Sequence, residues 1–292
     1  MTQDERPADT PSDLQLLDAG DGLRIGCLRH PPESPADDAT PVVLLHGGGL
    51  DHRMWRRQLD AGLPRPLIAL DARGHGWTEA PRDAAFRHGD DVVAALDALH
   101  VDRALLVGLS MGAATAVDAG LEHPDRVAGI VACGAGTSEP TFSDPWMLEQ
   151  LDAQRRAAEN LDPEAWIRTA LQFAAGPHRE LAAVDAEVVA ELETMLRRTL
   201  SVHIVGQDGP RAPTPATPVQ DTWERLGGLQ VPVLGVVGSL DADDHLRMVG
   251  ELVDRCPRAR LVTVDAAAHY PPLERPEEFT ATLREFLAAL EA

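Results

Sequence analysis

The chain of 292 residues contains no lysine, only three cysteines, and aromatic residues at 4%. Cys27, Cys133 and Cys256 lie far apart without a C-x-x-C pair, which argues against a disulfide framework and a zinc site. Apolar runs such as 127–133 are far shorter than the roughly 20 residues that cross a bilayer. Residues 1–13 are polar and lack the apolar part of a signal peptide, and we expect them to be disordered. These absences predict a soluble, cytoplasmic protein.

Positive charge is also scarce, because 47 acidic residues stand against 26 basic ones, all of which are arginine. The net charge of −21 repels nucleic acid and anionic membrane surfaces, so we expect neither as a partner. Arginine in place of lysine is typical of GC-rich genomes, and we attach no function to it. Hydrophobic residues make up 44% of the chain and charged residues 25%, as in globular proteins that bury a sizeable core.

Short apolar runs alternate with amphipathic segments along most of the chain. The apolar runs predict strands at 14–18, 23–29, 42–46, 67–71, 104–109, 127–133, 231–237 and 260–264. The amphipathic segments between them predict helices at 50–61, 88–100, 111–122, 244–255 and 276–290. Such alternation is typical of a mostly parallel sheet with helices on both faces.

The alternation stops near Gly134, and the pattern from 137 to 226 is helical. Helices are expected at 146–159, 163–175 and 185–205, followed by a proline-rich loop at 210–218. We therefore predict a core domain of two segments, 14–136 and 227–292, and a helical cap over 137–226, inserted after the sixth strand. Ligands of open α/β sheets bind beyond the carboxyl ends of the strands, which is where such a cap would lie.

A G-x-S-x-G sequence at 108–112 follows one predicted strand and opens the next predicted helix. Glycines at both ends permit a turn so tight that the hydroxyl of Ser110 is presented above the sheet. The amides at the start of the helix can stabilise an anion there. A helix-capping serine in a glycine-rich turn is the alternative interpretation, and two further motifs favour the nucleophile.

The first of these motifs is the run His46-Gly47-Gly48-Gly49 after the strand at 42–46. Acyl transfer needs two N–H donors aimed at the developing oxyanion, and a glycine turn at this place can supply the second. We interpret His46 itself as a structural hydrogen-bonding residue, because it ends a strand.

The second motif is His269, which lies between the last predicted strand and the last predicted helix. The chain order Ser…Asp…His then requires an acid after an intervening strand, and Asp241 follows the strand at 231–237. Asp243 and Asp244 fall where the next helix starts, and we interpret them as helix N-terminal charges rather than as the acid or as metal ligands. Glu139 is the alternative acid after the preceding strand.

Together these motifs resemble those of the α/β-hydrolase fold superfamily, over residues 14 to 290. Further matching segments are Asp71-Ala72-Arg73-Gly74-His75-Gly76, His123-Pro124-Asp125-Arg126-Val127 and Glu274-Arg275-Pro276. Small departures are Ala268, where the family often has glycine, and Thr78, where it often has serine. The resemblance implies an α/β-hydrolase fold with Ser110 as nucleophile, Asp241 as acid and His269 as base. It also implies an oxyanion hole formed by the backbone N–H groups of Gly48 and Met111.

The resemblance further implies a cofactor-free and metal-free serine hydrolase that acts on a small-molecule ester, thioester or lactone through an acyl-enzyme. The same triad also serves C–C bond hydrolases, perhydrolases and biosynthetic cyclases or thioesterases, and the fold serves ligand receptors. Serine rather than aspartate at the nucleophile position disfavours dehalogenase and epoxide hydrolase chemistry. Pocket lining is expected from Gly49, Trp146, Trp166, Trp223 and Tyr270, although the cap tryptophans fit simple packing equally well.

Overall fold

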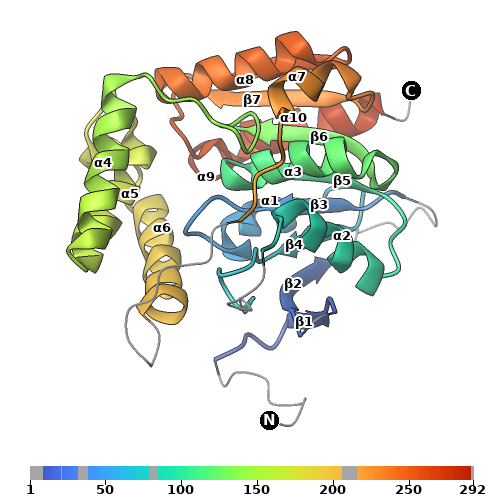
Figure 1. Ribbon diagram of the computed structural model, residues 1–292, viewed down its shortest axis with the longest axis horizontal. Coiled ribbons are helices and arrows are strands. Elements are labelled where there is room, and N and C mark those ends of the chain that lie inside the picture. Colours follow the sequence, from blue (N-terminus) through green and yellow to red (C-terminus); the bar gives the residue numbers. More distant parts are fainter. Residues whose placement is uncertain (1–8, 21, 32–38, 79–84, 206–215, 291–292) are drawn as a thin grey trace.

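A single sheet runs through the middle of the molecule (Figure 1). The computed structural model describes residues 9–20, 22–31, 39–78, 85–205 and 216–290. Within them the eight strands follow the order β1-β2-β4-β3-β5-β6-β7-β8. Their bounds are Leu14–Asp18, Arg24–His30, Val42–Leu45, Leu67–Leu70, Ala104–Leu109, Val127–Cys133, Val233–Gly238 and Ala259–Val264, for β1 to β8 in turn. The pairs β1–β2 and β2–β4 are antiparallel, and the other pairs of neighbouring strands are parallel.

Helices cover both faces of the sheet because the central strands are apolar at successive positions. In β5, Leu105 and Val107 belong to one buried cluster, whereas Leu106 belongs to the other, as the two-residue period of a strand requires. The first cluster is completed by α1, by α10 and by two of the helices inserted between β6 and β7, and the second by α2, α3 and α8. The helices have the bounds Arg56–Leu59 (α1), His88–Ala98 (α2), Met111–Glu122 (α3), Asp243–Arg255 (α8) and Pro276–Ala289 (α10). Two further helices, α7 (Thr222–Arg225) and α9 (Pro271–Glu274), are short.

Three helices lie in the chain between β6 and β7 and stand together at one side of the sheet (Figure 1). They are α4 (Pro145–Glu159), α5 (Pro163–Ala175) and α6 (Ala186–Thr199), and a π-helical segment, Leu200–Val205, continues α6. Their starts are well defined in the sequence, because Asp144, Asp162 and Asp185 each accept a hydrogen bond from a first-turn amide. The predicted fold, including a helical insertion after the sixth strand, is confirmed. The division into core and cap domains at 137 and 226 stays a prediction.

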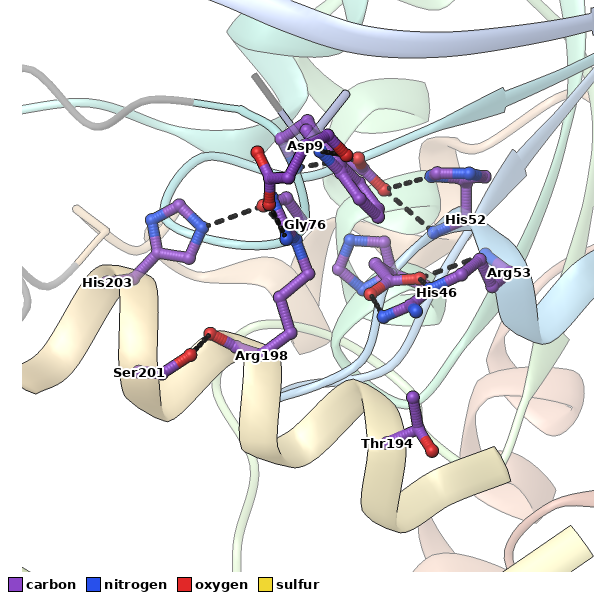
Figure 2. Close-up of polar contacts among 12 residues, drawn as sticks. Asp9, His46, His52, Arg53, Gly76, Thr194, Arg198, Ser201 and His203 are labelled. Atoms are coloured by element: carbon purple, nitrogen blue, oxygen red, sulfur yellow. Dashed lines mark hydrogen bonds and ion pairs between the residues drawn. The ribbon is translucent and has the colours of Figure 1, made fainter. Parts of the chain in front are cut away.

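The inserted helices are tied to the core at both ends. At the start of α4, the amides of Ser143 and Asp144 donate to the carboxylate of Asp244 on α8, at 2.7 and 2.8 Å. Asp244 is therefore a buried acceptor as well as a helix N-terminal acid. At the end of α6, the guanidinium of Arg198 lies 3.5 Å from the ring centroid of Trp77, and its Nε donates to the Gly76 carbonyl at 3.0 Å (Figure 2).

Other segments differ from the sequence expectations. The helix expected at 50–61 divides into a 3₁₀ turn, His52–Trp55, and α1. The turn begins after Asp51, because the Asp51 carboxylate accepts from the Arg53 amide and caps it there. Within the segment expected to be disordered, Asp9 pairs with Arg198, and its carbonyl accepts from the indole of Trp77. Residues 1–8 lie outside the described residues, as do residues 206–215, which include most of the proline-rich loop expected at 210–218. None of the helices described is long and apolar enough for a membrane span.

The turn between β5 and α3 is packed so closely that one added methyl group should lower the stability of the fold. A Cβ atom at Gly108 would lie 2.1 Å from the carbonyl oxygen of Gly112, so we expect Gly108→Ala to lower the free energy of unfolding by about 2 kcal/mol or more. Gly250→Ala on α8 is the matched control, because nothing lies within 4 Å of that Cβ, and it should raise stability by roughly 0.5–1 kcal/mol. Urea unfolding followed by circular dichroism measures both; equal midpoints would contradict the packing argument.

Candidate active site

Ser110 occupies the sharp turn between β5 and α3. Its φ of 53° and ψ of −114° are strained for a residue with a side chain, and its amide donates to the Cys133 carbonyl at 2.8 Å. A Cβ atom at Gly112 would lie 2.2 Å from the Leu45 carbonyl oxygen. The turn therefore packs directly against the end of β3, and only glycine fits on the far side of the serine. The G-x-S-x-G sequence has the strand–turn–helix setting that it predicts.

The glycine run after β3 lies against the same turn. A Cβ atom at Gly47 would lie 3.1 Å from the Leu109 side chain and 3.7 Å from its carbonyl oxygen. Gly48 is exposed, and Met111 is the first residue of α3, where backbone amides lack partners within the helix. The two predicted oxyanion donors thus belong to neighbouring segments at one edge of the sheet.

His46 has the structural role expected for it. Its Nδ1–H donates to the Gly47 carbonyl at 2.8 Å, and its Nε2 accepts from the Ala72 amide at 2.8 Å. Burial lowers the pKa of His46 despite the nearby carboxylate of Asp71, so the ring is neutral and joins the glycine run to the loop after β4.

Asp241 and His269 meet at the carboxyl ends of β7 and β8. Nδ1 of His269 donates to Oδ2 of Asp241 at 2.9 Å, and both side chains are buried. Burial alone would raise the pKa of Asp241, but the electrostatic attraction and the hydrogen bonds of the His245 and His269 rings outweigh it and hold that pKa well below its usual range. Burial lowers the pKa of His269 while Asp241 opposes the shift. The pair is therefore a carboxylate and a neutral imidazole whose Nε2 is an unprotonated base.

The three other acids considered from the sequence have different surroundings. Asp243 is exposed at the start of α8, and Asp244 binds the amides before α4. The Glu139 carboxylate accepts from the Thr222 amide and hydroxyl, both at 2.7 Å, which lowers its pKa. Of the four acids, Asp241 has the hydrogen bond to His269.

Two further residues touch this pair: His245, which the sequence suggested only as a member of an acidic cluster without metal-site spacing, and Gly134, which it did not suggest. Nδ1 of His245 donates to Oδ1 of Asp241 at 2.8 Å, and the His245 and His269 rings are stacked with centroids 4.1 Å apart and planes at 21°. A Cβ atom at Gly134, where φ is +68°, would lie 2.9 Å from Cε1 of His269. A signal for His245 was available in the sequence. It follows Asp241 by four residues at the start of a predicted helix, and this spacing brings the two side chains to the same side of the helix start. Gly134 directly follows β6, at the carboxyl edge of the sheet.

Two clusters in the described part of the chain bring three metal-ligating side chains together. One is Asp241, His245 and His269, and the other is Asp51, His52 and Asp71. In both clusters a carboxylate accepts hydrogen bonds from the histidine Nδ1 atoms, with His52 donating to Asp71 at 2.8 Å. Because these atoms are already engaged with one another, we assign no metal to either cluster.

A cavity of about 320 Å³ adjoins the nucleophile turn. Ser110 and Met111 line it together with His245 and Met248 from α8. The segments before α4 and before α7 contribute Phe142 and Pro218, among others. The cavity therefore lies between the sheet edge and the inserted segment, with the candidate nucleophile in its wall.

None of the five predicted pocket residues, all of which the structure describes, lines this cavity. Trp223 packs against Gly136, and its indole donates to the Glu139 carbonyl at 2.7 Å. Tyr270 is buried in the core, with its ring edge-on to His269 at 5.3 Å. These two residues fit the packing interpretation.

Of the remaining three predicted pocket residues, Gly49 belongs to the glycine run, and Trp146 and Trp166 belong to the inserted helices α4 and α5. The Trp166 ring would be 3.1 Å from a Cβ atom at Gly49, so it sits on the glycine run. Trp146 stacks edge-on against Phe173 at 5.5 Å, and Phe173 lies 5.8 Å from the His269 ring. The amide of His269 also donates to the Phe173 carbonyl at 3.3 Å. Aromatic residues of α4 and α5 thus cover the histidine, and their role toward a substrate stays a prediction.

Comparison with known proteins identifies the family. Residues 40–276 match the family model described as alpha/beta hydrolase fold. The chain is an α/β hydrolase. It is 30% identical over 274 residues to a pimeloyl-[acyl-carrier protein] methyl ester esterase of Neisseria meningitidis, covering 87% of this chain and 96% of the relative. A 3-oxoadipate enol-lactonase of Acinetobacter baylyi is 24% identical over 258 residues, covering 87% of this chain and 91% of that protein. The crystal structure of an esterase from Rhodococcus sp. ECU1013 superposes with a TM-score of 0.75 at 25% identity, covering 95% and 99% of the two chains.

Asp118, in the wall of the cavity, should make the stability of this α/β hydrolase depend on pH. The carboxyl is 7% exposed and accepts one long hydrogen bond, 3.4 Å, from the Ser138 amide. Burial raises its pKa to about 6, so the fold loses stability as the pH rises from the unfolded value near 3.8 through 6. We expect Asp118→Asn to be more stable than the wild type by about 1–3 kcal/mol at pH 7, with no gain at pH 3.5. Urea unfolding at both pH values tests this, with exposed Asp125→Asn as control; a gain independent of pH would refute it.

Proposed function

We propose that this α/β hydrolase is a cofactor-free serine hydrolase that cleaves a small organic ester, thioester or lactone. Ser110 is the nucleophile, His269 the general base and Asp241 the acid that orients it. The observation that carries the proposal is the buried hydrogen bond between Asp241 and His269, beside a cavity that Ser110 lines. The methyl ester esterase and the enol-lactonase among the relatives support ester and lactone carbonyls as targets.

The proposed reaction begins when Nε2 of His269 takes the Ser110 proton and Oγ attacks the substrate carbonyl carbon. The oxyanion accepts from the backbone N–H groups of Gly48 and Met111, each worth roughly 3 kcal/mol of barrier. Collapse breaks the bond to the leaving alcohol, which receives the proton from His269. A water molecule, deprotonated by the same histidine, then attacks the acyl-enzyme, and the acid leaves as Ser110 regains its proton.

We also infer that the protein works in the cytoplasm. The support is that Cys27, Cys133 and Cys256 are all buried free thiols, as in reducing compartments. Burial raises the pKa of Cys256 to about 11 and that of Cys133 well above its usual range, so neither thiol is poised as a second nucleophile.

The nucleophile is tested by a fluorophosphonate probe and a p-nitrophenyl ester. Ser110→Ala should abolish labelling and lower kcat by about 10⁴-fold or more, because it removes the hydroxyl that attacks the probe and the ester. Ser201→Ala is the control, since that serine is exposed and its hydroxyl donates to the Arg198 carbonyl. Labelling that persists in Ser110→Ala would show that another residue is the nucleophile. A wild-type protein that binds ligands without turnover would be a receptor instead.

The acid is tested by comparing three variants in the same assay. Asp241→Asn should lower kcat about 10³- to 10⁴-fold, because the amide cannot hold the His269 tautomer that leaves Nε2 free. Asp243→Asn and Glu139→Gln should remain within about three-fold of the wild type, since neither carboxylate is bound to His269. Collapse of kcat in either of these variants, with Asp241→Asn active, would reassign the acid while leaving Ser110 and His269 in place.

A further inference from the structure

Asp241 accepts hydrogen bonds from two histidines, and the proposed reaction uses only one of them. Oδ2 accepts from His269, whereas Oδ1 accepts from Nδ1 of His245 and from the Ala242 amide, both at 2.8 Å. We propose that His245 is a positioning residue, which fixes the Asp241 carboxylate against His269 and moderates its pull on the His269 proton. This inference rests on the proposed function, in which His269 is the base.

The geometry leaves the carboxylate and the base little freedom. Donors on both oxygens oppose rotation of the Asp241 carboxylate, so Oδ2 remains directed at Nδ1 of His269. The His245 ring is stacked on the His269 ring at 4.1 Å, and the Phe173 ring lies near both, at 6.2 and 5.8 Å. Gly134 approaches His269 closely as well. His269 is thus held in one plane by its neighbours, and His245 contributes both a hydrogen bond and a ring face.

The proton positions follow from the charge on Asp241. A carboxylate can only accept, so each histidine must carry its hydrogen on Nδ1, which leaves Nε2 of a neutral ring unprotonated. His245 is placed for this task by the helix, because it lies four residues after Asp241 in the first turn of α8. It also lines the cavity that Ser110 lines, so its ring belongs to the wall of the site.

Other titratable groups beside the pair are neutral or engaged elsewhere. Burial raises the pKa values of Tyr270 and Cys133 well above their usual ranges, so neither carries charge near neutral pH. Glu274 forms an ion pair with Arg179 and accepts from the Ala268 and Tyr270 amides, so its carboxylate binds the backbone on both sides of His269 and not the ring. Asp244 binds the Ser143 and Asp144 amides and Arg247. Within the described part of the chain, His245 is therefore the group placed to tune the Asp241–His269 pair.

His245 acts to lower the pKa of His269. Burial lowers the pKa of His269, Asp241 raises it, and His245 lowers it. The N–H of His245 also stabilises the Asp241 carboxylate and so weakens its attraction for the His269 proton. Removal of His245 takes away this N–H, so Asp241 attracts the His269 proton more strongly; the pKa of His269 should rise and the base should become protonated at higher pH.

The test compares His245→Phe, which keeps a ring but has no N–H, with His245→Asn, which keeps an N–H near the position of Nδ1. Hydrolysis of a p-nitrophenyl ester by the full chain is measured from pH 5 to 9. We expect His245→Phe to lose about 10-fold in kcat with KM changed less than about two-fold. The acid limb of its kcat/KM profile should shift upward by about 0.5–1 pH unit. His245→Asn should recover most of the lost kcat, and exposed Asp243→Asn is the control on the same helix.

A second measurement makes the test independent of turnover. The pKa of His269 is followed by NMR through its Cε1 proton, assigned by its absence in His269→Asn. A rise in His245→Phe supports the inference even if the wild type hydrolyses no ester, in which case only the proposed function fails. A wild-type kcat, acid limb and His269 pKa in His245→Phe would overturn the inference. Equal loss in His245→Asn and His245→Phe would also overturn it, because the ring alone would then matter. Circular dichroism checks folding, and His245→Ala replaces the phenylalanine variant if that variant does not fold.

Discussion

A buried carboxylate is the charge on which the rest of the candidate site depends. Asp241 is 1% exposed, and a buried charge is tolerated only where hydrogen-bond donors replace the water it loses. Its donors come from three places along the chain: the Ala242 amide, His245 on α8 and His269 on the loop after β8. The same loop is held to the Asp241 turn by the Leu240 amide, which donates to the Ala267 carbonyl at 2.9 Å. The end of β7, the start of α8 and the loop after β8 therefore stabilise one another through a single charge.

The inserted helices extend this network above the sheet. Phe173 on α5 accepts from the His269 amide and faces both histidine rings, while Asp244, three residues after Asp241, binds the chain at the start of α4. At the opposite end of the insertion, Arg198 and His203 reach the Gly76 carbonyl from α6 and the π-helical segment that continues it (Figure 2). The inserted helices are thus joined at one end to α8, which carries His245, and at the other end to the loop after β4.

Much of the fold and the central part of the candidate site could be predicted because their signals are local. Strands β5 and β6 and helix α3 have the predicted bounds, since an apolar run, a glycine-bounded turn and an amphipathic segment follow one another without a gap. Helices α4 and α5 begin beside Asp-Pro pairs, which cap and start a helix in any surroundings. Ser110, Asp241 and His269 each end a strand unit, and parallel strands bring such ends to one edge. The short helices α7 and α9 lack enough residues for a periodic signal.

The sequence by itself determined which residue types stand at the carboxyl edge of the sheet, and in what order. Only the tertiary structure decided which of them touch. Its hydrogen bonds distinguish Asp241 from the other three acids, because Asp241 alone among them binds His269. It also places His245 and Gly134 against His269. Trp223 and Tyr270 pack inside the protein and do not line the cavity beside Ser110. The physical reason is distance along the chain: strand and helix periods act within a few residues, whereas a shared carboxylate or a stacked ring depends on segments far apart, whose contacts exist only once the sheet has formed.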